Sequence, residues 1–203
     1  MIKKQKQSFF DNYIRENKVR LAVNLGMLIF GVVCGSMLFL YSANASEFSS
    51  QAKSYIENVK NLYSKQIFIS CLKDAAIMCT AFLVCSLFYI GEFLCPGYVF
   101  LRSAASGFSA CAVMGAFGLK KGTMILASLA AANVFYFTGL ISLSVETAKQ
   151  SRFVSGDFNK RAKNMSFISY LITIIFPVLL VFSACVVESF LAPYLILWCL
   201  KIF

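Results

Sequence analysis

The chain has 203 residues, of which 59% are hydrophobic and only 14% are charged. A soluble domain carries about 45–50% apolar and about 25% charged residues, so this composition excludes a soluble globular fold. The absence of histidine excludes serine–histidine and cysteine–histidine nucleophiles and histidine-ligated metals. The net charge of +10 would indicate nucleic acid in a soluble protein, but in a membrane protein it marks cytoplasmic loops. We therefore expect no nucleic-acid partner.

Five apolar segments, uncharged over most of their length, run through the chain, and each is long enough to cross a bilayer as a helix. A transmembrane helix needs about 20 apolar residues, within a range of about 17–25. Continuous apolar runs favour helices, because the strands of a membrane barrel alternate apolar and polar residues. We expect an all-α, polytopic transmembrane helical bundle that forms a single domain over residues 1–203. Its spans are predicted at residues 20–41, 73–94, 98–119, 122–145 and 164–187.

Two boundaries in this bundle depend on proline. Cys95-Pro96-Gly97 is a turn signal, so we predict the turn between the second and third spans there. Arg102 then lies in the first turn of the third span, from which its long side chain reaches the membrane surface. The last apolar run contains Pro193 and is too short to cross the bilayer, which predicts an interfacial or re-entrant tail over residues 189–203.

The basic residues predict the orientation of the bundle. They concentrate in the segment before the first span and in the loop between the fourth and fifth spans. Because cytoplasmic loops carry the excess of lysine and arginine, we expect the N-terminus inside and the C-terminus outside. An alternative is a cleaved secretory signal, since Ala43-Asn44-Ala45-Ser46 imitates a cleavage site. The apolar run before it is longer than the about 7–15 residues of a signal peptide, which favours an uncleaved span.

The largest external segment is predicted to form an amphipathic helix over residues 46–65. Its apolar residues recur at a spacing of three and four, which marks one helical face. Such a helix beside a membrane lies on the interface or packs over neighbouring spans. The alternative is a docking surface for an external partner. The basic loop at residues 146–163 is explained by attraction to anionic lipid, worth about 1 kcal/mol per basic residue.

Small residues recur on the faces of two predicted spans. Gly31 and Gly35 form a GxxxG motif in the first span, and the third span carries Ser103, Gly107 and Gly115 on one face. Such faces allow helices to approach closely within one chain, and a homo-oligomer contact is the alternative. The eight cysteines include no CxxC pair, so we interpret them as buried thiols and expect no metal and no cofactor.

Polar residues inside apolar spans are costly and therefore informative. Asn133 is central in the fourth span, where we expect it to form a hydrogen bond across helices. Glu188 is at the outer end of the fifth span. It is interpreted either as an interface residue or as an acid turned inward, where it organises the bundle or binds a partner. A lone carboxylate with no base or second acid does not indicate catalysis, so we expect no catalytic residue and no enzymatic activity.

The end of the fifth span carries a recognisable pattern, Glu188-Ser189-Phe190-Leu191-Ala192-Pro193. It is similar to the glutamate, aromatic residue, leucine, small residue and proline that close the last span of the stage II sporulation protein M family.

Two further regions resemble the same family. Arg102, followed by small residues and Gly107-Phe108, looks like the family's basic residue, small residue and Gly-Phe, which follow a proline represented here by Pro96. Asn133 matches an asparagine of the family's fourth span. Together with length and basic loops, the resemblance covers most of the chain.

The resemblance implies a non-enzymatic membrane scaffold that anchors and localises peptidoglycan-degrading enzymes during engulfment in endospore formation. The implied partners are membrane lipid and membrane-associated cell-wall hydrolases. The implied location is the bacterial cell membrane, at the sporulation septum on the mother-cell side. The residues that we expect to bind partners or organise the bundle are Glu188, Phe190, Pro193, Arg102, Gly107 and Asn133. The alternative function is a transporter or permease component, which the lack of charge between the ends of the predicted spans disfavours.

Overall fold

The structure is a computed structural model of the chain, and it describes residues 2–58, 64–154 and 167–202. These ranges are helical apart from short turns and contain no strand, which confirms the all-α expectation. The elements in chain order are α1 (Ile2–Tyr41), α2 (Ala45–Asn58), α3 (Ser64–Cys85), α4 (Gly91–Val154), α5 (Phe167–Val186), the π-helical turn η2 (Val187–Leu191) and α6 (Ala192–Ile202).

Four helical segments of the described chain are long and apolar enough to cross a membrane. They comprise Ile14–Tyr41, Lys65–Cys85, Gly91–Arg152 and Ser169–Cys199. Large apolar side chains cover their outer surfaces; Val19 and Leu38, for example, are 77% and 65% exposed. A surface of this kind is suited to lipid, because a soluble monomer rarely exposes such continuous apolar area.

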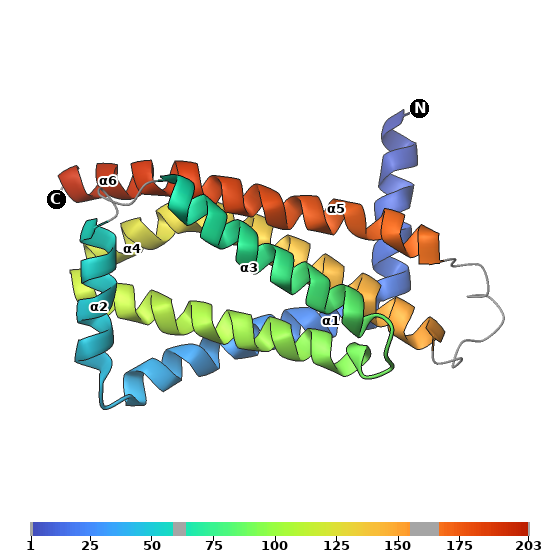
Figure 1. The fold of residues 1–203 in the computed structure, drawn as a ribbon, viewed down its shortest axis with the longest axis horizontal. Helices are drawn as coiled ribbons and strands as arrows, with labels where there is room; N and C mark the ends of the chain where they lie inside the picture. The colour runs from blue at the N-terminus through green and yellow to red at the C-terminus, as the bar shows by residue number, and fades with distance from the viewer. Residues whose placement is uncertain (1, 59–63, 155–166, 203) are drawn as a thin grey trace.

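Helix α4 is a helical hairpin. A straight helix of its 64 residues would be about 96 Å long, about three times the hydrocarbon thickness of a bilayer. Gly118 interrupts it with φ 75° and ψ 171°, and the chain reverses there (Figure 1). The two legs, residues 91–117 and 119–154, therefore lie in one bundle with α1, α3 and α5. They correspond to the third and fourth apolar segments of the sequence.

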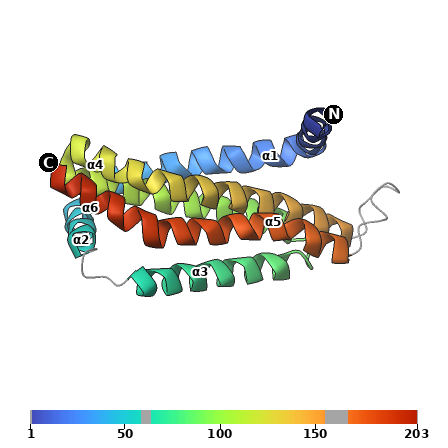
Figure 2. The same ribbon diagram turned by 90° about the horizontal axis from the view of Figure 1, so that it is seen from above.

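Helix α2 crosses one end of this bundle (Figures 1 and 2). It lies at the end where α4 reverses and where α6 terminates. Its Ile56 is 5% exposed and packs in one cluster with Val113, Ile125 and Ile196. The predicted external helix therefore begins at Ala45 and covers the bundle end up to Asn58; residues 59–63 lie outside the described part.

The turn predicted at Cys95-Pro96-Gly97 is wrong. Helix α3 ends at Cys85 and α4 begins at Gly91, so the turn is residues 86–90 and Pro96 is inside α4. Gly91 allows this turn because its Cα lies against the Cys85 carbonyl, where a Cβ would clash. Pro96 is the sixth residue of α4, so it removes one intrahelical hydrogen bond, to the Glu92 carbonyl, without ending the helix.

The interfacial or re-entrant tail predicted over residues 189–203 does not begin as a separate segment. The helix continues from α5 through η2 into α6 (Figure 1), and the apolar segment Ser169–Cys199 has no break at Pro193. In η2, the Ala192 N–H bonds to the Val187 carbonyl, five residues earlier. This wider turn gives the proline ring space that an α-helix would not provide, which explains why the helix persists.

Candidate functional site

The small-residue faces predicted from the sequence pack against each other within the chain. A Cβ added at Gly31 would clash with Ser103 and Phe100, and one added at Gly35 would overlap the backbone of Ala104. These contacts join α1 to the first leg of α4 and confirm packing within one chain. The GxxxG face is therefore covered and is not open to a second copy.

Gly107, in the first leg of α4, belongs to the same close contact between α1 and α4, which we call the α1–α4 seam. A Cβ at Gly107 would overlap the backbone of Val32 in α1, so this position lets the two helices touch. Gly107 does not line the cavities described next. Its role is to allow close packing of α4 on α1.

Three of the six candidate residues, distant in sequence, line one small cavity. This inner cavity has a volume of about 240 Å³ and lies between the two legs of α4 and η2. Its polar lining residues are Arg102, Ser106, Ser109, Asn133 and Glu188. The structure therefore brings a cation, an amide and a carboxylate to one place among apolar helices.

Arg102 lies deep in α4 and not at its first turn. Because α4 begins at Gly91, Arg102 is about three helical turns inside the helix. Its guanidinium carbon lies 5.1 Å from the centre of the Tyr136 ring, on the other leg of α4. This cation–π contact holds the charge in the apolar bundle. Arg102 was expected in the first turn of a helix because the turn was predicted at Pro96; the helix in fact begins earlier, at Gly91.

The expectation that the spans are free of internal charge is therefore wrong as well. Arg102 and Glu188 lie well inside the apolar helices, and Lys73 and Asp74 lie inside α3. Charged residues within such segments are rare and mark sites where helices, water or a ligand stabilise them.

Asn133 does not link helices through a hydrogen bond within the described residues. Its side chain is exposed at the inner cavity. The cross-helix link is instead made by Asn24, which is 2% exposed and accepts a 2.8 Å hydrogen bond from Ser144. Asn24, like Asn133, is a polar residue in an apolar helix, and which of the two links helices depends on which helix face is covered.

Glu188 connects the inner cavity to a larger one. This outer cavity, of about 550 Å³, is lined by Glu188 and Pro193 together with residues of α2, α3 and α4. Both cavities share Ser109, Val113 and Leu129 in addition to Glu188, so they adjoin. The Glu188 carboxylate is therefore in the wall of both cavities.

Helix α2 forms one wall of the outer cavity. Phe48, Ala52, Tyr55 and Ile56 of α2 line this cavity. Burial raises the pKa of Tyr55, and the nearby Glu188 carboxylate raises it further. The amphipathic helix α2 and the Glu188 carboxylate therefore border the same cavity.

Phe190 faces a different neighbour. Its ring is 5.7 Å from that of Phe68 in α3, in a tilted arrangement, and it does not line the inner or the outer cavity. It is 45% exposed. Of the six candidates, four surround the two cavities, while Phe190 packs η2 on α3 and Gly107 packs α4 on α1.

The described residues contain no group of three His, Cys, Asp or Glu side chains that could hold a metal ion. The eight cysteines are free thiols. Cys185 contacts α3 through its thiol, which lies 3.5 Å from the Cys71 carbonyl. The site's chemistry is therefore that of two charged side chains, neutral polar groups and apolar walls.

No family model, curated protein or solved structure matches the chain.

Proposed function

We propose that this chain is a non-enzymatic membrane scaffold that anchors partner proteins through the outer cavity. The observation that carries the proposal is the position of Glu188 and Pro193 in the wall of that cavity, directly under α2. An apolar cavity with a single carboxylate recognises an apolar helix that carries one donor, such as a lysine or serine side chain.

The proposed topology has five transmembrane passes, with the N-terminus inside and the C-terminus outside. The reversal of α4 at Gly118 supports it, because the two legs of α4 then cross separately. The continuous segment Ser169–Cys199 supports it too, because it is long enough for the last pass. In this topology α2 and the outer cavity lie on the external side, where a cell-wall partner is found.

The resemblance in sequence supplies the proposed partners and place. The partners are membrane-associated peptidoglycan-degrading enzymes, and the place is the bacterial cell membrane, at the septum during engulfment. What supports this proposal is the pattern from Glu188 to Pro193, which forms η2 and the start of α6 beside the cavity.

The experiment is co-purification of N-terminally tagged protein from native membranes in mild detergent. We expect the unmodified chain to retain a cell-wall hydrolase, and Glu188→Gln to reduce its recovery at least about tenfold, as for the loss of one charged hydrogen bond. Glu57→Gln is the matched control, because Glu57 is an exposed acid whose partner is Lys53 in the same helix. The control variant also loses one negative charge, but at a position outside the cavity.

Two results would contradict the scaffold. One is a chain that retains no hydrolase at all under conditions that preserve other membrane complexes. The other is equal recovery with Glu188→Gln and Glu57→Gln, while both variants unfold at the temperature of the unmodified chain.

A transporter component is the second candidate, favoured by the charged and polar lining of the inner cavity. Arg102, Asn133 and Glu188 could bind a small polar solute within the membrane helices. Solute flux into liposomes that contain the chain alone, abolished by Arg102→Gln, would favour this function. Absence of flux together with hydrolase binding would reject it.

A further inference from the structure

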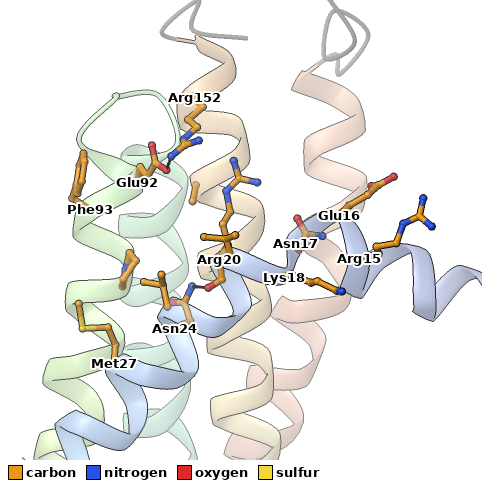
Figure 3. Close-up of a pocket in the computed structure, with 14 residues that line it drawn as sticks. Arg15, Glu16, Asn17, Lys18, Arg20, Asn24, Met27, Glu92, Phe93 and Arg152 are labelled. Atoms are coloured by element: carbon orange, nitrogen blue, oxygen red, sulfur yellow. Dashed lines mark hydrogen bonds and ion pairs between the residues drawn. The ribbon is translucent and has the colours of Figure 1, made fainter. Parts of the chain in front are cut away.

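A cavity lined by several charged residues lies at the other end of the bundle from α2. It has a volume of about 540 Å³ and is formed between α1 and the two ends of α4 (Figure 3). Its polar and charged lining residues are Arg15, Glu16, Asn17, Lys18, Arg20, Asn24, Glu92 and Arg152. The proposed scaffold function does not use this cavity.

The lining carries an excess of positive charge. Four of the lining side chains are basic and two are acidic. One of the acids, Glu92, is already neutralised by an ion pair with Arg152. The nearby buried acid Glu146 is likewise neutralised, because Lys149 donates to it a 2.8 Å hydrogen bond. The cavity is therefore electropositive, even when the acids around it are counted.

Arg20 is the central cation of this cavity. Its backbone is fixed, since its carbonyl accepts a 2.9 Å hydrogen bond from the side-chain amide of Asn24. Its side chain extends toward the Arg152–Glu92 pair (Figure 3). Its Nε is buried and has no hydrogen-bond partner among the described residues. A buried donor without an acceptor is costly, and an anion placed between Arg20 and Arg152 would remove that cost.

The remaining wall of the cavity is apolar. Val19, Val23, Met27, Phe93 and Pro96 line it beside the charged groups. Val23 and Phe93 are 45% and 67% exposed, so this wall continues onto the apolar outer surface of the bundle. A ligand that fits both parts has an anionic head and an apolar chain.

We propose that this cavity binds an anionic phospholipid, with the headgroup phosphate held by Arg20 and Arg152 and an acyl chain along Val23 and Phe93. Arginine guanidinium groups match phosphate oxygens with paired, charge-assisted hydrogen bonds. Basic pockets between membrane helices on the cytoplasmic side bind such headgroups in general. The site lies at the end of the bundle that carries the basic N-terminal segment.

The test measures lipid retention by native mass spectrometry of the purified full chain. Phosphatidylglycerol and phosphatidylcholine with identical acyl chains are the two probes. We expect phosphatidylglycerol to be retained preferentially, and Arg20→Gln to weaken its binding about tenfold. Lys120→Gln is the matched control, since it removes one exposed basic charge beside Gly118, far from the cavity. It is expected to change binding less than twofold.

Arg20→Lys separates the site from a general effect of charge. It keeps the charge and helix but removes Nε and the planar fork, so we expect binding to weaken at least about threefold. A second experiment measures the unfolding temperature of the unmodified chain, once with phosphatidylglycerol added and once with inorganic phosphate added. Stabilisation by the lipid alone supports the proposal, and equal stabilisation by free phosphate overturns the assignment to lipid. Equal losses in Arg20→Gln and Lys120→Gln, or no preference for phosphatidylglycerol, overturn the site itself.

Discussion

Ser144 of α4 donates a 2.8 Å hydrogen bond to the side-chain oxygen of Asn24 in α1, although the two residues are 120 positions apart. Both side chains are buried. Asn24 also donates to the Arg20 carbonyl within its own helix. One amide therefore ties the first helix to the second leg of the hairpin and at the same time holds the backbone of the arginine in the charged cavity.

Ser144→Ala tests this link. The substitution removes the donor and leaves the Asn24 oxygen buried without a partner, so we expect a loss of about 1 kcal/mol in the free energy of unfolding. Unfolding in detergent, followed by circular dichroism, measures it. Ser106→Ala is the control, because the Ser106 hydroxyl bonds only to the Arg102 carbonyl of its own helix. Equal losses in the two variants would show that the cross-helix bond contributes nothing.

Gly35→Ala tests the close approach of α1 and α4. Its Cβ would overlap the backbone of Ala104, which cannot move as a flexible side chain can, so we expect a loss of about 1–3 kcal/mol. Gly26→Ala, in the same helix, meets nothing within 4 Å. There we expect unchanged or higher stability, because alanine is the better helix former by about 1 kcal/mol. A Gly35→Ala variant as stable as Gly26→Ala would show that α1 and α4 do not approach each other closely at Gly35.

The sequence predicts the helices and this seam because both depend on local spacing. A continuous apolar run is helical in any fold, and small residues four positions apart share a face whatever packs on it. The spacing of Gly31 and Gly35 therefore led to the right contact, although the partner positions Ser103 and Ala104 are distant in the chain.

The turns were harder to predict because they depend on contacts between helices. Cys95-Pro96-Gly97 is the stronger local turn signal, but the chain turns at residues 86–90, where Gly91 fits against Cys85 and Ser151 donates to the Phe88 carbonyl. Because of that shift, Arg102 lies about three turns along α4 and not in the first turn of a helix. The same holds for Pro193, whose continued helix depends on a π turn that has no sequence signature.

Reporter fusions test the proposed topology. We expect alkaline phosphatase, which folds only outside the cytoplasm, to be active when fused after Lys120 or after Phe203. The first position follows the reversal at Gly118, and the second ends the chain. A fusion after Arg152, at the opposite end of the second leg of α4, is expected to be inactive. Activity after Arg152 or its absence after Phe203 would contradict a five-pass bundle with its C-terminus outside.

Gly118→Ala tests the hairpin itself. At φ 75° and ψ 171° the backbone is in a region that is essentially restricted to glycine, and a Cβ there costs about 1–3 kcal/mol whatever space surrounds it. Nothing lies within 4 Å of the added Cβ, so strain and not a clash is the expected cause of destabilisation.

The control for this variant is Gly97→Ala, which also meets nothing within 4 Å but has no positive φ. Because Gly97 is inside a helix, its replacement is expected to leave stability unchanged or higher. Unfolding in detergent measures both variants. If Gly118→Ala were as stable as Gly97→Ala, the chain would not reverse through a left-handed residue at this position, and the two legs of α4 would have to be joined in another way.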